Sequence, residues 1–176
     1  GALTALPQGS AFLSALTSGG SPRVVLSPGP GADWPAMLAE ATAATYLSGR
    51  GVIICVPDQR DAVRVGAALE RRLGAGHHVV LTAEAGPAQR YRNFLAISRG
   101  ARRIVVGNRA AAFAPVKDLG LVAIFDDGDE AHAEPRAPYP HSREVLLLRA
   151  ALSNTAAIVA GHARSVEAHY LVRTGW

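Results

Sequence analysis

Six short apolar runs, separated by stretches with helical periodicity, constrain the fold of this chain more than any other feature. The runs cover residues 23–27, 52–56, 78–82, 103–106, 120–125 and 156–160, and the helical stretches lie near 34–48, 59–73, 87–98, 141–152 and 164–172. Continuous runs rich in Val and Ile are typical of parallel strands buried on both faces. Right-handed crossovers between them predict an α/β fold, a three-layer sandwich around a mostly parallel sheet.

The least ordinary residues follow the ends of five of these runs, at 28–35, 57–58, 107–109, 126–130 and 161–164. Ligands of open parallel sheets bind at the carboxyl ends of the strands. The sequence therefore predicts a binding site at that edge of the sheet.

Length and composition are those of one globular domain. The chain has 176 residues, of which 49% are hydrophobic. We expect residues 1–22 to form a linker with a short helix within 11–16, and residues 23–176 to form one domain of a larger protein. No apolar stretch approaches the roughly 20 residues of a membrane span, and no signal sequence is recognisable, so a cytoplasmic location is expected. The single cysteine, Cys55, is predicted to be buried in a strand. The net charge of +4 favours a polyanionic partner.

The segment after the first run looks like a phosphate-binding loop without its phosphate chemistry. It reads Pro28-Gly-Pro-Gly-Ala-Asp-Trp-Pro35, with glycines at Gly29 and Gly31. A working loop reads GxxxxGK[ST], and its Lys and hydroxyl bind phosphate and Mg²⁺. Trp34 and Pro35 stand at those two positions, and neither can do so. Asp33 is predicted to cap the following helix, with Pro35 in its first turn.

Several segments, in this order along the chain, resemble the first helicase lobe of the PriA family of primosomal replication-restart proteins, in its actinobacterial form. Residues 104–121 read IVVGNRAAAFAPVKDLGL and are similar to IVVGTRSALFAPFxNLGL of that family. Val56-Pro57 and His141-Ser-Arg-Glu-Val145 match further segments of it. The resemblance runs from about Arg23 to Trp176 and implies a RecA-like lobe that acts on DNA.

The same resemblance places three altered segments where the family binds ATP. Its GVTGSGKTEV falls on residues 28–37, so Trp34 replaces the lysine and Pro35 the threonine. Its DEEH falls on residues 125–128, with Phe125 at the Asp position and Asp126 and Asp127 at the Glu positions; a shift of one residue restores Asp126 as the acid beside the metal. In the third segment, Arg164 and a serine replace the TP of SATP. We therefore expect no catalytic residues, no metal site and no cofactor.

The nucleic-acid side of the pattern is retained. Asn108, Arg109 and Arg164 are the candidate DNA contacts, with a helix that starts near Arg109 directing its N–H groups at a phosphate. Arg109 could instead pair with Asp126 or Asp127, and the acidic turn could be solvated or could hold a cation weakly.

Three hypotheses remain open. The first is a DNA-binding pseudo-helicase lobe whose partners are forked or single-stranded DNA and primosome proteins. The second is an active ATP- and Mg²⁺-dependent 3'-5' helicase motor, and the third an unrelated small-molecule α/β enzyme.

Overall fold

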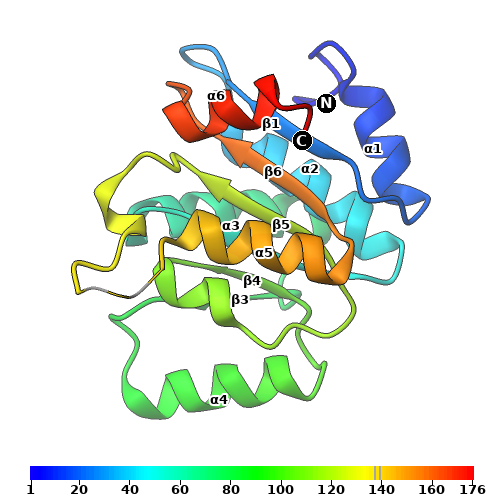
Figure 1. Cartoon of the computed structure of the whole chain (residues 1–176). Coiled ribbons are helices and arrows are strands. Elements are labelled where there is room, and N and C mark those ends of the chain that lie inside the picture. Colours follow the sequence, from blue (N-terminus) through cyan, green and yellow to red (C-terminus); the bar gives the residue numbers. More distant parts are fainter. Residues whose placement is uncertain (137, 139) are drawn as a thin grey trace.

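A six-stranded parallel sheet forms the centre of the protein (Figure 1). The computed structural model describes residues 1–136, 138 and 140–176. The strands are β1 (Arg23–Leu26), β2 (Gly51–Cys55), β3 (His78–Leu81), β4 (Ile104–Gly107), β5 (Leu119–Phe125) and β6 (Ala156–Ala160). Their order across the sheet is β1-β6-β5-β2-β4-β3, and every neighbouring pair is parallel. All carboxyl ends therefore lie along one edge, which we call the carboxyl edge.

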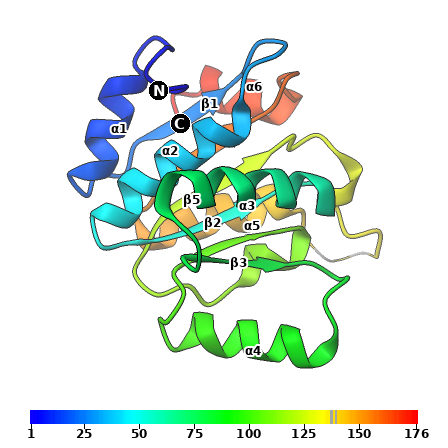
Figure 2. The same ribbon diagram turned by 180° about the vertical axis from the view of Figure 1, so that it is seen from behind.

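Helices cover both faces of the sheet (Figures 1 and 2). On one face lie α2 (Trp34–Leu47) and α3 (Gln59–Leu73); on the other lie α5 (Ser142–Ser153), α6 (Val166–Arg173) and the short 3-10 helix η1 (Arg109–Phe113). Helix α4 (Pro87–Ser98) lies beside β3 at the end of the sheet, and a second 3-10 helix, η2 (Glu130–His132), follows β5. The predicted three-layer α/β fold is confirmed, and the predicted bounds of these strands and of α2 to α6 differ from the observed ones by at most two residues. No helix among the described residues is long and apolar enough to cross a membrane.

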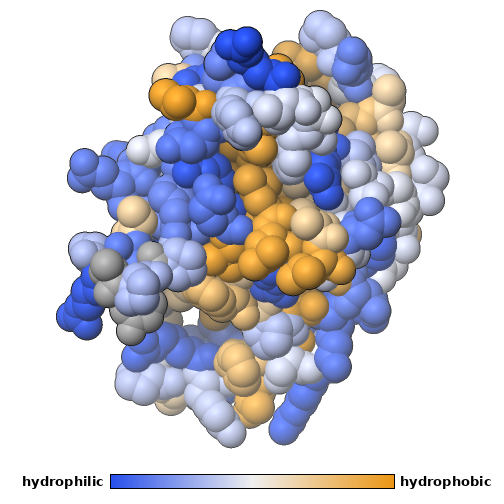
Figure 3. Space-filling view, viewed as in Figure 1, coloured by the Kyte–Doolittle hydropathy of each residue, from blue (hydrophilic) through white to orange (hydrophobic). Residues whose placement is uncertain are grey.

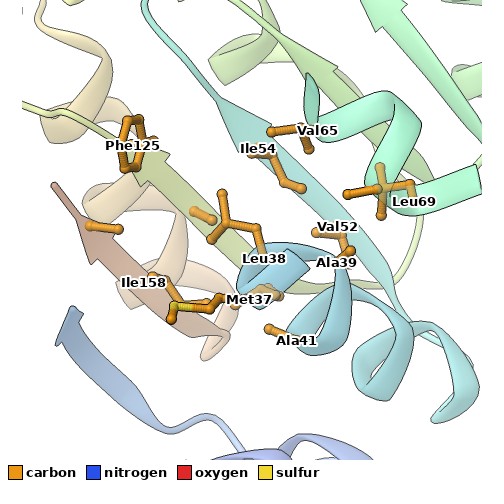
Figure 4. Packing of buried hydrophobic residues seen from close by; sticks show 14 of the residues in the cluster. Met37, Leu38, Ala39, Ala41, Val52, Ile54, Val65, Leu69, Phe125 and Ile158 are labelled. Carbon is orange, nitrogen blue, oxygen red and sulfur yellow. The ribbon is translucent and has the colours of Figure 1, made fainter. Parts of the chain in front are cut away.

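Strand β2 illustrates why the strands read as unbroken apolar runs. Val52 and Ile54 pack against α2 and α3, whereas Ile53 and Cys55 belong to the cluster beneath α5 and η1. Figure 4 shows the first cluster, in which Leu38 of α2 reaches the sheet. Alternate residues of a strand face opposite sides, so a strand between two helical layers needs apolar residues at every position. Cys55 is fully buried, as predicted, and burial raises the pKa of its thiol to about 12.

Residues 1–22 pack onto α2. Helix α1 (Gly9–Thr17) lies against α2, and its Leu16 is completely buried. The Glu40 carboxylate of α2 accepts hydrogen bonds from two backbone N–H groups within the first three residues. Arg50 donates to the Leu16 carbonyl at 2.9 Å. Helix α2 is buried on most of its circumference, between the sheet, α3 and α1, so the N-terminal segment completes its cover.

Candidate functional site

The loop after β1 uses its own groups to satisfy the backbone N–H groups at the start of α2. Asp33 is the N-cap, as predicted, and its carboxylate accepts a hydrogen bond from the Ala36 N–H at 3.1 Å. The Met37 N–H donates to the Asp33 carbonyl at 3.1 Å, and the Trp34 N–H donates to a carbonyl of the preceding loop at 3.0 Å. Pro35 has no N–H. Helix N-termini bind anions through free N–H groups, and the first four residues of α2, all of them described, keep none free.

One of the two loop glycines permits the backbone turn. Gly29 and Gly31 are exposed, and a Cβ at either position would meet open space. Only Gly31 has a backbone conformation that favours glycine, with φ at +77°.

Trp34 turns inward and stacks face to face on Phe125, the last residue of β5. The ring centroids lie 3.6 Å apart with an angle of 6° between the planes, and Trp34 is only 2% exposed. The His162 ring meets Phe125 edge-on at 5.5 Å, and the Arg64 guanidinium lies 5.1 Å from the centre of the Trp34 ring. Aromatic pairs of this kind contribute about 0.5–1.5 kcal/mol beyond the burial of their area. The stack therefore fixes the start of α2 on the end of β5.

The three segments that the resemblance marks as altered meet at this stack. By that resemblance Trp34 falls at the lysine position of the family, an ungapped alignment puts Phe125 at its metal-side acid, and His162 lies in the segment matched to SATP. The Nδ1 atom of His162 also lies 3.3 Å from the Pro28 carbonyl oxygen of the loop. In working motors the lysine binds the phosphates of ATP and the acid holds the Mg²⁺ ion, so the ligand lies between the two side chains. Here two apolar rings touch at those positions.

The acidic turn after β5 directs one of its two candidate acids into the protein. Asp127 is 2% exposed, and its Oδ2 atom accepts hydrogen bonds from Arg143 at 3.0 Å and from Ser165 at 2.6 Å. Two further carboxylates flank Arg143 on its solvent side. Asp126 is half-buried and has a left-handed backbone, with φ at 54°. A fully solvated acidic turn is therefore wrong for Asp127, whose charge is held in a buried ion pair. Within residues 1–136, 138 and 140–176, no three Asp, Glu, His or Cys side chains form a group suited to a metal ion.

His132 links the acidic turn to the end of β5 and to the start of α5 through two hydrogen bonds. Its ring is completely buried, and Nε2 donates to the Phe125 carbonyl at 2.9 Å. Its own carbonyl accepts a hydrogen bond from the Ser142 hydroxyl at 3.1 Å. Burial lowers the pKa of His132, and the hydrogen bond to Phe125 opposes this only in part. The imidazole therefore ties η2 to the end of β5 through the hydrogen bond from Nε2.

Arg109 forms an ion pair that the sequence did not indicate. Its guanidinium lies 3.0 Å from the Glu134 carboxylate and donates to the Ala133 carbonyl at 3.0 Å. The alternative pairing with Asp126 or Asp127 is wrong, because the Arg109 guanidinium pairs with Glu134 and the Asp127 carboxylate pairs with Arg143. The helix expected to start here is the five-residue 3-10 helix η1.

The three candidate DNA contacts occupy two places on the carboxyl edge. Asn108 and Arg109 follow β4, whereas Arg164 follows β6 and is exposed. Strands β5 and β2 lie between β6 and β4. Three strand spacings, or roughly 14 Å, therefore separate the two strand ends.

A groove between α4 and η1 adds residues that sequence reasoning missed. It has a volume of about 1000 Å³, and its lining includes Tyr91 and Phe94 of α4, Phe113 of η1, and Asn108 and Arg109. We call it the α4 groove; Figure 3 shows an opening in the surface at this place, beside α4. A signal was present in the sequence: two aromatic residues three positions apart in a helix with four polar residues around them. That pattern equally fits a helix that buries its aromatic face.

Solved structures define the class of fold. A variant C-terminal domain of Dbp5 from S. cerevisiae, bound to Gle1 and IP6, superposes with a TM-score of 0.59 at 14% identity and covers 88% of this chain and 82% of that domain. The helicase MrfA, bound to DNA and AMPPNP, gives a TM-score of 0.58 at 11% identity over 93% of this chain and 24% of MrfA. This chain therefore has the fold of a RecA-like helicase lobe.

Curated relatives define the family more narrowly. The probable replication restart protein PriA of Mycobacterium tuberculosis is 47% identical over 169 residues, which are 96% of this chain and 26% of that protein. PriA of Mycobacterium leprae is 46% identical over the same shares, and PriA of Treponema pallidum is 31% identical over 77% of this chain and 20% of that protein. No family model matches the chain. The chain is homologous to the replication restart protein PriA, as its motifs indicated, and spans about a quarter of the length of its mycobacterial relatives.

Proposed function

We propose that this chain is the first RecA-like lobe of a PriA-type replication restart protein, and that it binds DNA without hydrolysing ATP. Its role is structural: it helps to recognise forked or single-stranded DNA in the cytoplasm and to recruit primosome proteins.

The hydrogen bonding at the start of α2 is the observation that supports the loss of ATP hydrolysis. A triphosphate in this loop would have to displace the Asp33 carboxylate from the N–H of Ala36 and part Trp34 from Phe125. It would also meet the negative charge of Asp33. Two like charges 4 Å apart repel by about 4 kcal/mol at an effective dielectric constant near 20. The loop supplies neither a lysine nor a hydroxyl in return.

The carboxyl edge supports the binding of DNA. Arg109 and Arg164 stand at two separate points of this edge, and the chain has a net charge of +4. Neutralising phosphates with arginines releases counterions, which is the main source of affinity when no sequence is read.

Two titrations test the proposal. The chain is titrated with Mg²⁺–ATP and, separately, with a labelled DNA fork at low ionic strength, where phosphate contacts are strongest. We expect binding of the fork and no binding of the nucleotide. An active motor would bind both ligands, and an unrelated small-molecule enzyme would bind neither.

Arginine variants test the DNA contacts. We expect Arg109→Ala and Arg164→Ala each to weaken fork binding and to lower the slope of log K against log salt by about one. Arg71, in the last turn of α3, is the matched control, because this helix runs back from the carboxyl edge and ends far from it. If Arg71→Ala weakens binding as much as the other two variants do, the assignment of the DNA contacts is wrong.

A further inference from the structure

Three aromatic rings stand exposed around the α4 groove. Tyr91 and Phe94 come from successive turns of α4, and Phe113 comes from η1 on the opposite wall. Their exposed fractions are 64%, 52% and 62%. Helix α4 buries only Ile97 among its twelve residues, so it turns much of its apolar surface into the groove instead of the core.

Such an arrangement is costly unless something covers the rings. Burying one phenylalanine side chain is worth about 1.5–3 kcal/mol. Single exposed apolar residues are ordinary on a protein surface, but a group of them around one hollow marks a binding surface. A volume of about 1000 Å³ is at the upper end of the roughly 300–1,000 Å³ found for sites that hold a small organic ligand.

The charges around the groove indicate what covers it. Arg90 and Arg109 line it, with Glu134 as the acid that holds Arg109 in place. Helix α4 carries a second arginine, Arg92, and no acidic residue. Aromatic rings beside arginines are complementary to a ligand that joins flat apolar groups to a chain of negative charges.

We propose that the α4 groove binds unpaired bases of single-stranded DNA by stacking them on Tyr91, Phe94 and Phe113. This inference rests on the proposed function, since it specifies how the DNA is held. Arg90 and Arg109 contact the phosphates that join the stacked bases. Proteins that bind single strands combine basic surfaces with aromatic stacking in this way. In a duplex each base is already stacked on its neighbours and paired, so a duplex cannot offer base faces to these rings.

The experiment distinguishes the contribution of the bases to affinity from that of the phosphates. Fluorescence anisotropy measures the binding of the chain to labelled oligothymidylate and to an abasic phosphodiester of equal length and charge. Stacking is worth a factor of about 5 to 150 in affinity for each base. We expect the abasic strand to bind more weakly by at least the lower value, and Tyr91→Ala to reduce this difference by the share of one of the three rings, a factor of about 5 or more.

Matched variants distinguish stacking from altered folding. Tyr170 of α6 is 66% exposed and lies outside the groove, so Tyr170→Ala should leave both affinities unchanged. Tyr91→Phe keeps the aromatic face and should retain the preference for oligothymidylate. Thermal unfolding of each variant shows whether its fold is intact.

The possible results separate this inference from the proposed function. Equal binding of both strands, with Tyr91→Ala behaving as Tyr170→Ala does, overturns stacking in the groove and leaves DNA binding intact; it is also the result expected if the groove holds a protein segment. Failure of the chain to bind either strand overturns both proposals. If the chain prefers oligothymidylate and neither Tyr91→Ala nor Phe113→Ala changes this preference, the bases stack elsewhere. That result overturns the assignment to this groove.

Discussion

Replacement of Trp34 by alanine tests whether the altered loop has become a structural element. Trp34 is 2% exposed and stacks on Phe125 with 3.6 Å between ring centroids. Truncation of a buried Trp typically costs about 3–5 kcal/mol. Domains of this kind are stable by only about 5–15 kcal/mol, so Trp34→Ala should remove a large part of the total.

Calorimetry or circular dichroism measures this loss. For a chain of this size, each kcal/mol shifts the melting temperature by about 2–4 °C, so Trp34→Ala should lower it by roughly 6–20 °C. Trp176, the other tryptophan, is only partly buried and stacks under Arg23, so Trp176→Ala should shift it by a few degrees at most. A cycle with Trp34→Leu and Phe125→Leu should give a coupling of about 0.5–1.5 kcal/mol.

A small change in melting temperature would refute this reasoning. If Trp34→Ala melts within about 3 °C of the unchanged protein, Trp34 does not hold the loop to the sheet. The view that aromatic packing replaces phosphate chemistry at this place would then be wrong.

Three further predictions concern the buried groups around the carboxyl edge. Arg143→Met should destabilise the protein by about 3–5 kcal/mol, because it leaves the Asp127 carboxylate buried without its cation; the double variant with Asp127→Asn should recover much of this loss in urea unfolding. Burial lowers the pKa of His132 below its ordinary 6.5. Below pH 6.5 this imidazole is therefore protonated to a greater extent in the unfolded chain than in the folded protein. Stability should therefore fall as the pH drops below 6.5, and it should fall less steeply in His132→Gln, measured by denaturation between pH 7.5 and about pH 5. Burial raises the pKa of the Cys55 thiol to about 12, so a thiol reagent at pH 8 should label it only after denaturant unfolds the chain; rapid labelling of the native protein would contradict its burial.

The elements of the fold were predictable because their signals are local. Residues 52–56 form an apolar run typical of a strand between two helical layers, and the structure adds that Asp58, two residues after the run, is the N-cap of α3. The N-cap role of Asp33 was predictable for the same reason, since an N-cap acts on a helix that starts one residue later.

The contacts of the candidate site depend instead on the order of strands across the sheet. The sequence identified Trp34 and Phe125 as departures from a motif, but their stacking requires β5 to lie under the start of α2. The pairing of Arg109 with Glu134 joins the segment after β4 to the loop after β5, and these two strands are not neighbours in the sheet. The exposure of Tyr91 could not be predicted, because a helix with aromatics three residues apart usually buries them.

The position of β1 has a consequence for how the protein folds during synthesis. Among the described strands, β1 pairs with β6 alone, and Leu26 lies opposite Ala160. The ribosome makes roughly 130 further residues between these two positions, which at about 5–20 residues per second takes on the order of 7–26 s. Throughout that interval Val24 and Leu26 have no strand beside them, and an unpaired apolar strand is prone to associate with other chains. A nascent chain of this protein therefore needs α1 and α2, or a chaperone, to shield β1 until β6 emerges.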